Sequence, residues 1–309
     1  MAVLISYFLV TPDMIVLMEV FILYLALVLI GVCFGSFAGA SVWRLRARQL
    51  ASDKRHRETY DKGEYARLKK LTTASFASDR SQCLHCGYGL KWYDLIPVVS
   101  WLSLGGKCRN CRKAIGRFEP LIELGVALFF VLSYMFWPYP LDSVLEITRL
   151  VVWLIAGVGL AILFAYDAKW FLLPDKINFA VIGLGAVNAG IVIAQSSDKL
   201  ATVASIVGAV AILSGLYLAL YLISKGAWIG FGDIKLGLGL ALLLADWRLA
   251  FIALFAANLI GCLLVLPAMA VGRLKRDSHV PFGPLLIVGF VVAQLAGVYL
   301  VDTYLFSVI

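Results

Sequence analysis

Charged residues are scarce in this 309-residue chain. They make up only 15% of it, whereas 62% of the residues are hydrophobic and the mean hydropathy is +0.91. Soluble domains do not reach these values. The apolar residues stand in continuous runs, whereas the strands of a membrane β-barrel alternate apolar and polar residues. The sequence therefore predicts an all-α polytopic membrane protein.

The first residues also lack the basic segment and small-residue cleavage site of a removable signal peptide, and the chain shows no internal repeat. Its apolar runs predict about eight transmembrane helices. The run at 233–245 is short for a full crossing of about 20 residues, so we expect it to be tilted or partly re-entrant. The predicted spans lie at about 14–42, 119–137, 149–166, 177–194, 201–223, 233–245, 248–271 and 282–304.

Acidic residues are few in the segment after the first span. Between Arg44 and Arg117 there are seventeen Lys and Arg residues against six Asp and Glu, so the excess of +11 exceeds the whole chain's net charge of +8. By the positive-inside rule this loop is cytoplasmic, and an even number of spans then places both termini outside. The charge favours anionic membrane lipid as a partner over nucleic acid.

This pattern divides the chain into three predicted parts. Residues 1–43 hold the first transmembrane helix, 44–118 form a basic cytoplasmic domain, and 119–309 form a domain of further transmembrane helices. Within the basic domain, residues 44–80 are predicted to be a flexible or helical surface insert, with a helix near 60–71. The composition changes from Gln82 onward to that of a small ordered domain.

Four of the six cysteines form two CxxC pairs, Cys83 with Cys86 and Cys108 with Cys111. Two-residue spacing lets both thiolates of a turn reach one tetrahedral ion, and two such turns complete a four-cysteine zinc site. A cytoplasmic location disfavours disulfides. The alternatives are redox-active pairs or unligated thiols. The other two cysteines lie within apolar spans, where they act as small apolar fillers.

Two carboxylates stand at the ends of apolar runs. Asp167 follows the run 151–166, and Asp233 follows Gly230-Phe231-Gly232 just before the run 236–245. An ionisable residue at membrane depth is costly, by roughly 2.5–3.5 kcal/mol at a helix centre, so its retention indicates function. The predicted topology brings both acids to the cytoplasmic face, where two carboxyls that share a proton form an aspartyl protease. The alternative is that each is an ordinary interfacial residue at a helix terminus.

Further motifs lie in register along the chain. They comprise Cys83-x-x-Cys86, Asp94-x-Ile96-Pro97-x-x-Ser100-Trp101-Leu102, Cys108-x-x-Cys111, Glu119-Pro120-x-x-Glu123, Asp167 with Pro174-Asp175, Gly230-x-Gly232-Asp233 and Pro281-Phe282-Gly283-Pro284. Together they resemble the type IV prepilin peptidases, the bacterial leader peptidases and N-methyltransferases of type IV pilin and type II secretion systems. The resemblance extends from Gly35 to the last span, apart from the 44–80 insert.

The resemblance implies that Asp167 and Asp233 are the catalytic pair and that residues 119–309 form the aspartyl peptidase domain. The implied substrate is a type IV prepilin or pseudopilin, with a short basic leader, a glycine before the scissile bond and an apolar helix after it. A water activated between the carboxyls cleaves it at the cytoplasmic membrane face, without a covalent intermediate. Asp175 is the rival of Asp167, and we expect it to cap the next span or orient substrate. The residues expected to bind substrate or shape the site are Gly230, Gly232, Lys235, Pro174 and Asp175.

The family's second activity methylates the new amino terminus with S-adenosylmethionine, and it is associated with the N-terminal region and the cysteine domain. This chain departs from the family pattern there. Ala38-Gly39 follow Gly35-Ser36-Phe37, where a branched residue and Asn are common, and Arg46 follows Arg44-Leu45 in place of Pro. The sequence selects no catalytic residue for methyl transfer.

Three other classes of protein account for part of the pattern. A transporter would have paired broken helices in repeated halves, which this sequence does not show. A membrane-anchored zinc module that recruits partners explains the cysteines but neither aspartate segment. A presenilin-like GxGD protease shares the chemistry but gives no reason for the cysteine loop.

Overall fold

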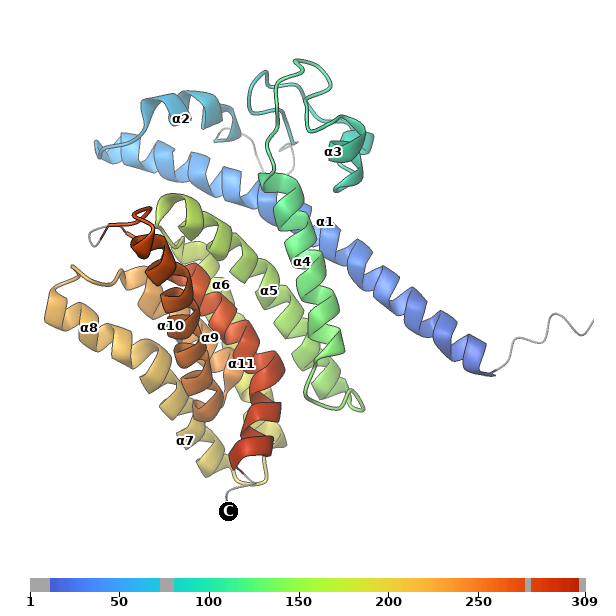
Figure 1. Cartoon of the computed structure of the whole chain (residues 1–309), viewed down its shortest axis with the longest axis vertical. Coiled ribbons are helices and arrows are strands. Elements are labelled where there is room, and N and C mark those ends of the chain that lie inside the picture. Colours follow the sequence, from blue (N-terminus) through green and yellow to red (C-terminus); the bar gives the residue numbers. More distant parts are fainter. Residues whose placement is uncertain (1–11, 73–80, 276–278, 306–309) are drawn as a thin grey trace, which may run out of the picture.

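The computed structural model describes residues 12–72, 81–275 and 279–305, and in these ranges the protein is helical apart from loops and two isolated β-bridges. Helices α5–α11 form one bundle, and α1 crosses α4 beside it (Figure 1). The longer helices are α1 (Pro12–His56), α4 (Phe118–Met135), α5 (Val144–Trp170), α6 (Asp175–Gln195), α7 (Lys199–Val210), α8 (Leu216–Ser224), α9 (Phe231–Leu244), α10 (Trp247–Ala270) and α11 (Phe282–Leu305). The shorter elements are α2 (Lys62–Leu68), η1 (Lys69–Leu71), η2 (Trp92–Asp94), α3 (Val99–Ser103) and the π-helical η3 (Ala211–Gly215).

Seven helical segments in the described ranges are long and apolar enough to cross a membrane, and α7, η3 and α8 together form one of them. This confirms the predicted class, an all-helical polytopic membrane protein with the cysteine segment between the first two spans. The remaining predicted span corresponds to α9, which has 14 residues. At 1.5 Å per residue it covers about 21 Å, less than the roughly 30 Å of a bilayer's hydrocarbon core.

Helix α1 continues beyond the basic residues at which the first span was predicted to end, and it reaches His56. Charged residues end a membrane span, but Arg and Lys have good helix propensity and do not end a helix. The short α2 folds back along this extension, where Arg46 pairs with Glu64 at 2.7 Å. Part of the 44–80 insert is therefore helical, and α2 with η1 occupies the place of the helix predicted near 60–71.

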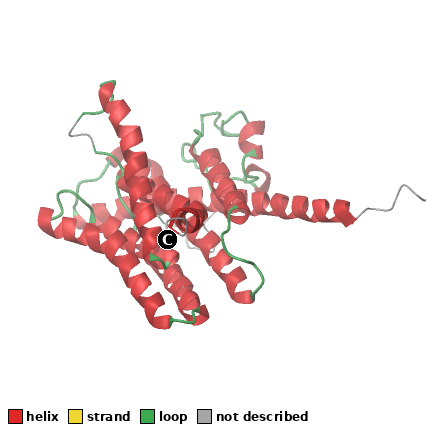
Figure 2. Cartoon of the chain, turned by 60° about the horizontal axis from the view of Figure 1, so that its bottom comes forward, coloured by secondary structure: helices red, strands yellow, loops and turns green. Residues whose placement is uncertain are grey.

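Small residues let α1 pack closely against α4. A Cβ added at Gly31 would come within 2.6 Å of the Ala127 Cα, and one at Gly35 within 2.5 Å of the Glu123 Cα. Backbones this close leave no room for larger side chains. Towards its amino terminus α1 extends away from the bundle, and there its apolar side chains are exposed (Figure 2).

The short α9 lies inside the bundle because its glycines, which have no side chain, let neighbouring helices approach closely. A Cβ at Gly237 would lie 2.0 Å from the Leu213 carbonyl oxygen of η3, and one at Gly239 would meet Val181 of α6 at 3.0 Å. The Ser214 hydroxyl of η3 donates to the Ile234 carbonyl at 3.0 Å. Helix α9 is thus buried against α6 and η3, and these contacts fix the orientation of its axis in the bundle.

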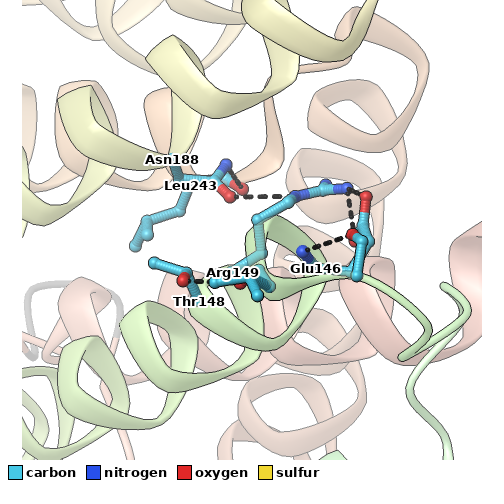
Figure 3. A network of polar contacts seen from close by, with 7 residues as sticks. Glu146, Thr148, Arg149, Asn188 and Leu243 are labelled. Carbon is cyan, nitrogen blue, oxygen red and sulfur yellow. Dashed lines mark hydrogen bonds and ion pairs between the residues drawn. The ribbon is translucent and has the colours of Figure 1, made fainter.

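A buried polar network holds the carboxyl end of α9 (Figure 3). Asn188 of α6 donates to the Leu243 carbonyl at 2.8 Å, and its own oxygen accepts from Arg149 Nε at 3.3 Å. Arg149 also pairs with Glu146 at 3.1 Å, near the start of α5. The end of α9 therefore lies beside the start of α5, so the two helices run antiparallel.

Replacing Asn188 with Leu should lower the free energy of unfolding by about 1–3 kcal/mol, because it leaves Arg149 Nε and the Leu243 carbonyl without partners in an apolar bundle. Thermal unfolding in detergent measures the change. Asn258→Leu is the matched control, since Asn258 is exposed and bonds only within α10. Equal stability losses in the two variants would show that the network does not anchor α9.

Candidate active site and metal centre

Asp167 lies one turn before the end of α5 and is buried, with 6% of its surface exposed. Its Oδ2 accepts a hydrogen bond of 3.0 Å from the Gly283 N–H at the start of α11. The first N–H groups of a helix have no partner within the helix and carry partial positive charge, so they stabilise a carboxylate. A Cβ at position 283 would lie 2.8 Å from this oxygen, so the site requires glycine there.

Asp233 lies in the first turn of α9 and is half-buried. Its Oδ2 accepts a hydrogen bond of 3.3 Å from the Gly230 N–H, which closes the turn that leads into the helix. The Asp167 and Asp233 carboxylates interact electrostatically. Helices α6 and α11 both pack against α5 and α9, and they thus bring together the two acids that the sequence selected.

The loop between α5 and α6 packs beside both acids. The Leu173 side chain lies against Gly232, where an added Cβ would meet it at 3.0 Å, and against Gly283, where the distance would be 3.4 Å. Pro174 then forms the N-cap of α6. Gly232 therefore contacts the same Leu173 side chain as Gly283, whose N–H bonds to Asp167.

Asp175 has a different environment from Asp167. It is exposed at the start of α6, and its Oδ1 pairs with the Lys235 Nζ of α9 at 2.7 Å. The Lys235 ammonium also lies 5.0 Å from the centre of the Phe231 ring. This ion pair links the first turns of α6 and α9. The buried carboxylate of the two is therefore Asp167, not Asp175.

Two further polar residues near the acids were not selected from the sequence. Asn178 of α6 is fully buried and donates to the Gly232 carbonyl at 3.5 Å, and Tyr217 of α8 is 4% exposed and interacts electrostatically with Asp233. The Tyr217 hydroxyl and the Asn178 carbonyl oxygen have no hydrogen-bond partner among the described residues. Asn178 was detectable as an amide in an apolar run, whereas Tyr217 fits the pattern of an ordinary apolar helix face.

The four cysteines converge as predicted, with their sulfur atoms all within 4.8 Å of one another. The two CxxC turns have the same conformation: the Gly87 N–H bonds to the Cys83 carbonyl at 2.9 Å, and the Arg112 N–H to the Cys108 carbonyl at 3.0 Å. Gly87 and Arg112 both have positive φ, at 74° and 57°.

The sulfur positions fit one tetrahedral ion. The Cys83 and Cys111 sulfurs are 3.9 Å apart, close to the spacing of about 3.8 Å that Zn–S bonds of 2.3 Å produce in a tetrahedron. Burial raises the pKa of Cys83, whereas the Tyr88 N–H lowers the pKa of Cys86. A bound cation makes thiolates of all its ligands, so the cluster could hold a metal.

Comparison with known proteins identifies the chain's relatives. The family model for the bacterial peptidase A24 N-terminal domain matches residues 29–137, and that of the type IV leader peptidase family matches residues 154–266. The chain is 31% identical to a type 4 prepilin-like proteins leader peptide-processing enzyme of Escherichia coli, over 84% of this chain and 88% of the relative. It is 29% identical to a prepilin leader peptidase/N-methyltransferase of Pseudomonas aeruginosa, over 91% of this chain and 93% of the relative. No solved structure matches.

Both family models describe peptidases. A pair of carboxylates in an apolar bundle suits this class of enzyme. The chain belongs to the type IV leader peptidase family. The resemblance inferred from the sequence motifs is thereby confirmed.

Gly283→Ala should reduce kcat/KM for cleavage of a type IV prepilin by about tenfold or more, because the new methyl group would displace the Asp167 carboxylate. Gly183→Ala is the matched control, since a Cβ there meets nothing within 4 Å. Initial rates and melting temperatures are measured together. Full activity of the Gly283→Ala variant would mean that the Gly283 contact does not position Asp167.

Proposed function

We propose that this chain is a membrane aspartyl endopeptidase that removes the short basic leader of type IV prepilins or pseudopilins and then N-methylates the new amino terminus with S-adenosylmethionine. The observation that carries the proposal is the meeting of Asp167 and Asp233, which lie 66 residues apart in sequence, at one end of the bundle. Membership of the leader peptidase family supports the choice of substrate.

The proposed cleavage uses the two carboxyls in different protonation states. Like charges held close together cannot both ionise, so one carboxyl keeps a proton while the other accepts one from a water molecule. That water attacks the carbonyl carbon of the leader glycine, and the protonated carboxyl donates to the carbonyl oxygen as the charge develops. The bond to nitrogen then breaks, and the amine leaves with a proton from the pair.

We place the active site at the cytoplasmic face of the plasma membrane, with both termini on the opposite side. The end of the bundle that holds the carboxylates is also the end that faces the basic half of α1 and the cysteine segment (Figure 1). The excess of Lys and Arg in that segment supports a cytoplasmic location by the positive-inside rule. A substrate with a basic leader and an apolar helix would present its cleavage site at this depth.

The four-cysteine cluster is proposed to hold one structural zinc ion. Cys83, Cys86, Cys108 and Cys111 would bind it, joining the two CxxC turns. The Asn110 amide donates to the Cys86 sulfur at 3.7 Å and would orient that ligand. The ion's contribution is to fold the segment that packs over α1 and α4.

Asp167→Asn and Asp233→Asn should each reduce cleavage of a type IV prepilin in liposomes to background, because each removes one of two carboxyls that act together. Asp142→Asn is the matched control, as Asp142 is exposed in the loop between α4 and α5. Asp175→Asn should retain most of the activity. Cleavage by both folded active-site variants would refute the proposal.

Metal analysis of the purified chain should find about one zinc ion per molecule. Cys83→Ser and Cys108→Ser should lose the metal and lower the melting temperature, whereas Cys262→Ser, on the exposed surface of α10, should change neither. A folded and active protein without stoichiometric metal would contradict the zinc assignment.

A further inference from the structure

The cysteine segment between α1 and α4 contains a stretch that carries no charge. Residues 95–106, which we call the uncharged segment, hold no Asp, Glu, Lys, Arg or His, although the surrounding loop 44–117 has seventeen Lys and Arg residues. Charge resumes directly on both sides, at Asp94 and Lys107. Helix α3 lies in the middle of this stretch. Segments that face water are usually rich in charged residues, so the composition indicates an apolar neighbour.

The two sides of α3 have different surroundings. Trp101 lines a cavity of about 260 Å³ between the cysteine segment, α1 and α4, and Glu123 lines the same cavity. Val99 and Leu102 do not line it; they are three residues apart, so they share the other side of α3, and they are 59% and 63% exposed. Trp92 of the adjoining η2 is 77% exposed. Large apolar side chains exposed in this way mark an interaction surface.

The length of α4 sets the depth of this region. Its 18 residues cover about 27 Å, slightly less than the roughly 30 Å of a bilayer's hydrocarbon core, so its first residue, Phe118, must lie at the membrane surface. The neighbouring spans agree. The Trp43 ring of α1 lies 5.6 Å from the Phe118 ring and 5.8 Å from the ring of Trp170, the last residue of α5. Three spans thus place an aromatic side chain at one level, as is typical of the membrane–water interface.

Helix α3 is attached to α4 at this level or below it. The Val98 N–H, just before α3, donates to Glu123 Oε2 at 2.7 Å, and Glu123 is the sixth residue of α4. Helix side chains lean towards the amino terminus, so Val98 lies between the levels of Phe118 and Glu123. Figure 1 shows α3 to one side of the start of α4. The uncharged segment therefore reaches the membrane surface.

The point of attachment borders a surface that lipid covers. The Ser36 hydroxyl of α1 also bonds to the Glu123 carboxylate. Phe37 and Leu124, which follow these two residues on α1 and α4, are each about half exposed. Both belong to helices that are apolar and long enough to cross the membrane, so their exposed side chains meet lipid. The outer side of α3 is continuous with this lipid-covered surface.

We propose that the uncharged segment is a membrane-docking surface, in which Val99, Leu102 and Trp92 contact the acyl chains of the leaflet next to the basic loop. Lys91 and Lys107 are exposed on either side of the segment and supply the positive charge that anionic headgroups attract. Docking fixes the cysteine segment to the bilayer at a point separate from α1 and α4. The inference goes beyond the proposed function, since it requires the membrane class of the chain and neither activity.

A spin label at position 102 tests the docking on the full chain in nanodiscs that contain anionic lipid. The label is attached through a genetically encoded ketone side chain, so that all six cysteines stay native. Collisions are measured with molecular oxygen, which concentrates in lipid, and with a nickel chelate, which stays in water. Position 102 should favour oxygen, as should position 128, where Leu128 is exposed in the middle of α4. Position 113, where Lys113 is exposed, should favour the chelate.

Two results of this measurement would refute the proposal. Collisions of the chelate at position 102 as frequent as those at position 113 would mean that α3 stands in water. Protection of position 102 from both reagents would mean that another protein surface, such as a second copy of the chain, covers α3.

A charged substitution tests the same surface from the other direction. With the label at position 99, Leu102→Asp should lower the ratio of docked to undocked α3 by about tenfold or more, because burial of one leucine side chain is worth a factor of this order. The change is measured as a rise in chelate collisions. Ala114→Asp is the matched control, since Ala114 is exposed and lies outside the uncharged segment. An equal effect of the two substitutions would contradict docking through Leu102.

Discussion

The constraint on which the structure depends is the burial of two carboxylates at one end of an apolar bundle. Each carboxylate accepts a hydrogen bond from a backbone N–H at the start of a helix, Asp167 from Gly283 and Asp233 from Gly230. These N–H groups have no partner within their helices, so they stabilise the acids without placing a cation in the membrane. The helix starts must then be held in place, and the packing of α9 achieves this through glycines and the Asn188 network.

The amino-terminal part of the chain obeys a different constraint. There the close contact of α1 with α4 at Gly35 brings Ser36 and Glu123 together, and the cysteine segment covers them through the Val98 N–H. The cavity lined by these residues and the aspartate pair therefore lie on different elements.

Sequence patterns predicted the parts of this arrangement that depend on local chemistry. Continuous apolar runs predicted the helices, CxxC spacing predicted the cysteine cluster, and the acids at span ends predicted the pair at Asp167 and Asp233. The shortness of α9 was also apparent, because the apolar run itself is short.

Contacts set by tertiary packing could not be predicted in this way. The Gly283 motif was visible, but its hydrogen bond to a residue 116 positions away depends on where α11 begins in the bundle. Tyr217 resembles any aromatic residue on an apolar helix, and the extension of α1 to His56 follows from helix propensity that a hydropathy pattern does not report. Glu123 likewise stood out only as part of a motif until α1 and the cysteine segment enclosed it.

The most direct test of the central claim is chemical cross-linking of cysteines placed at the two acidic positions. In membranes, the double variant Asp167→Cys with Asp233→Cys should be joined by a short bifunctional thiol reagent, and mass spectrometry of the digested protein would identify the linked peptides. Asp175→Cys with Lys235→Cys is the reference pair, because those side chains meet at 2.7 Å. The account predicts a link in both variants. Linkage of the reference pair without linkage between positions 167 and 233 would contradict it.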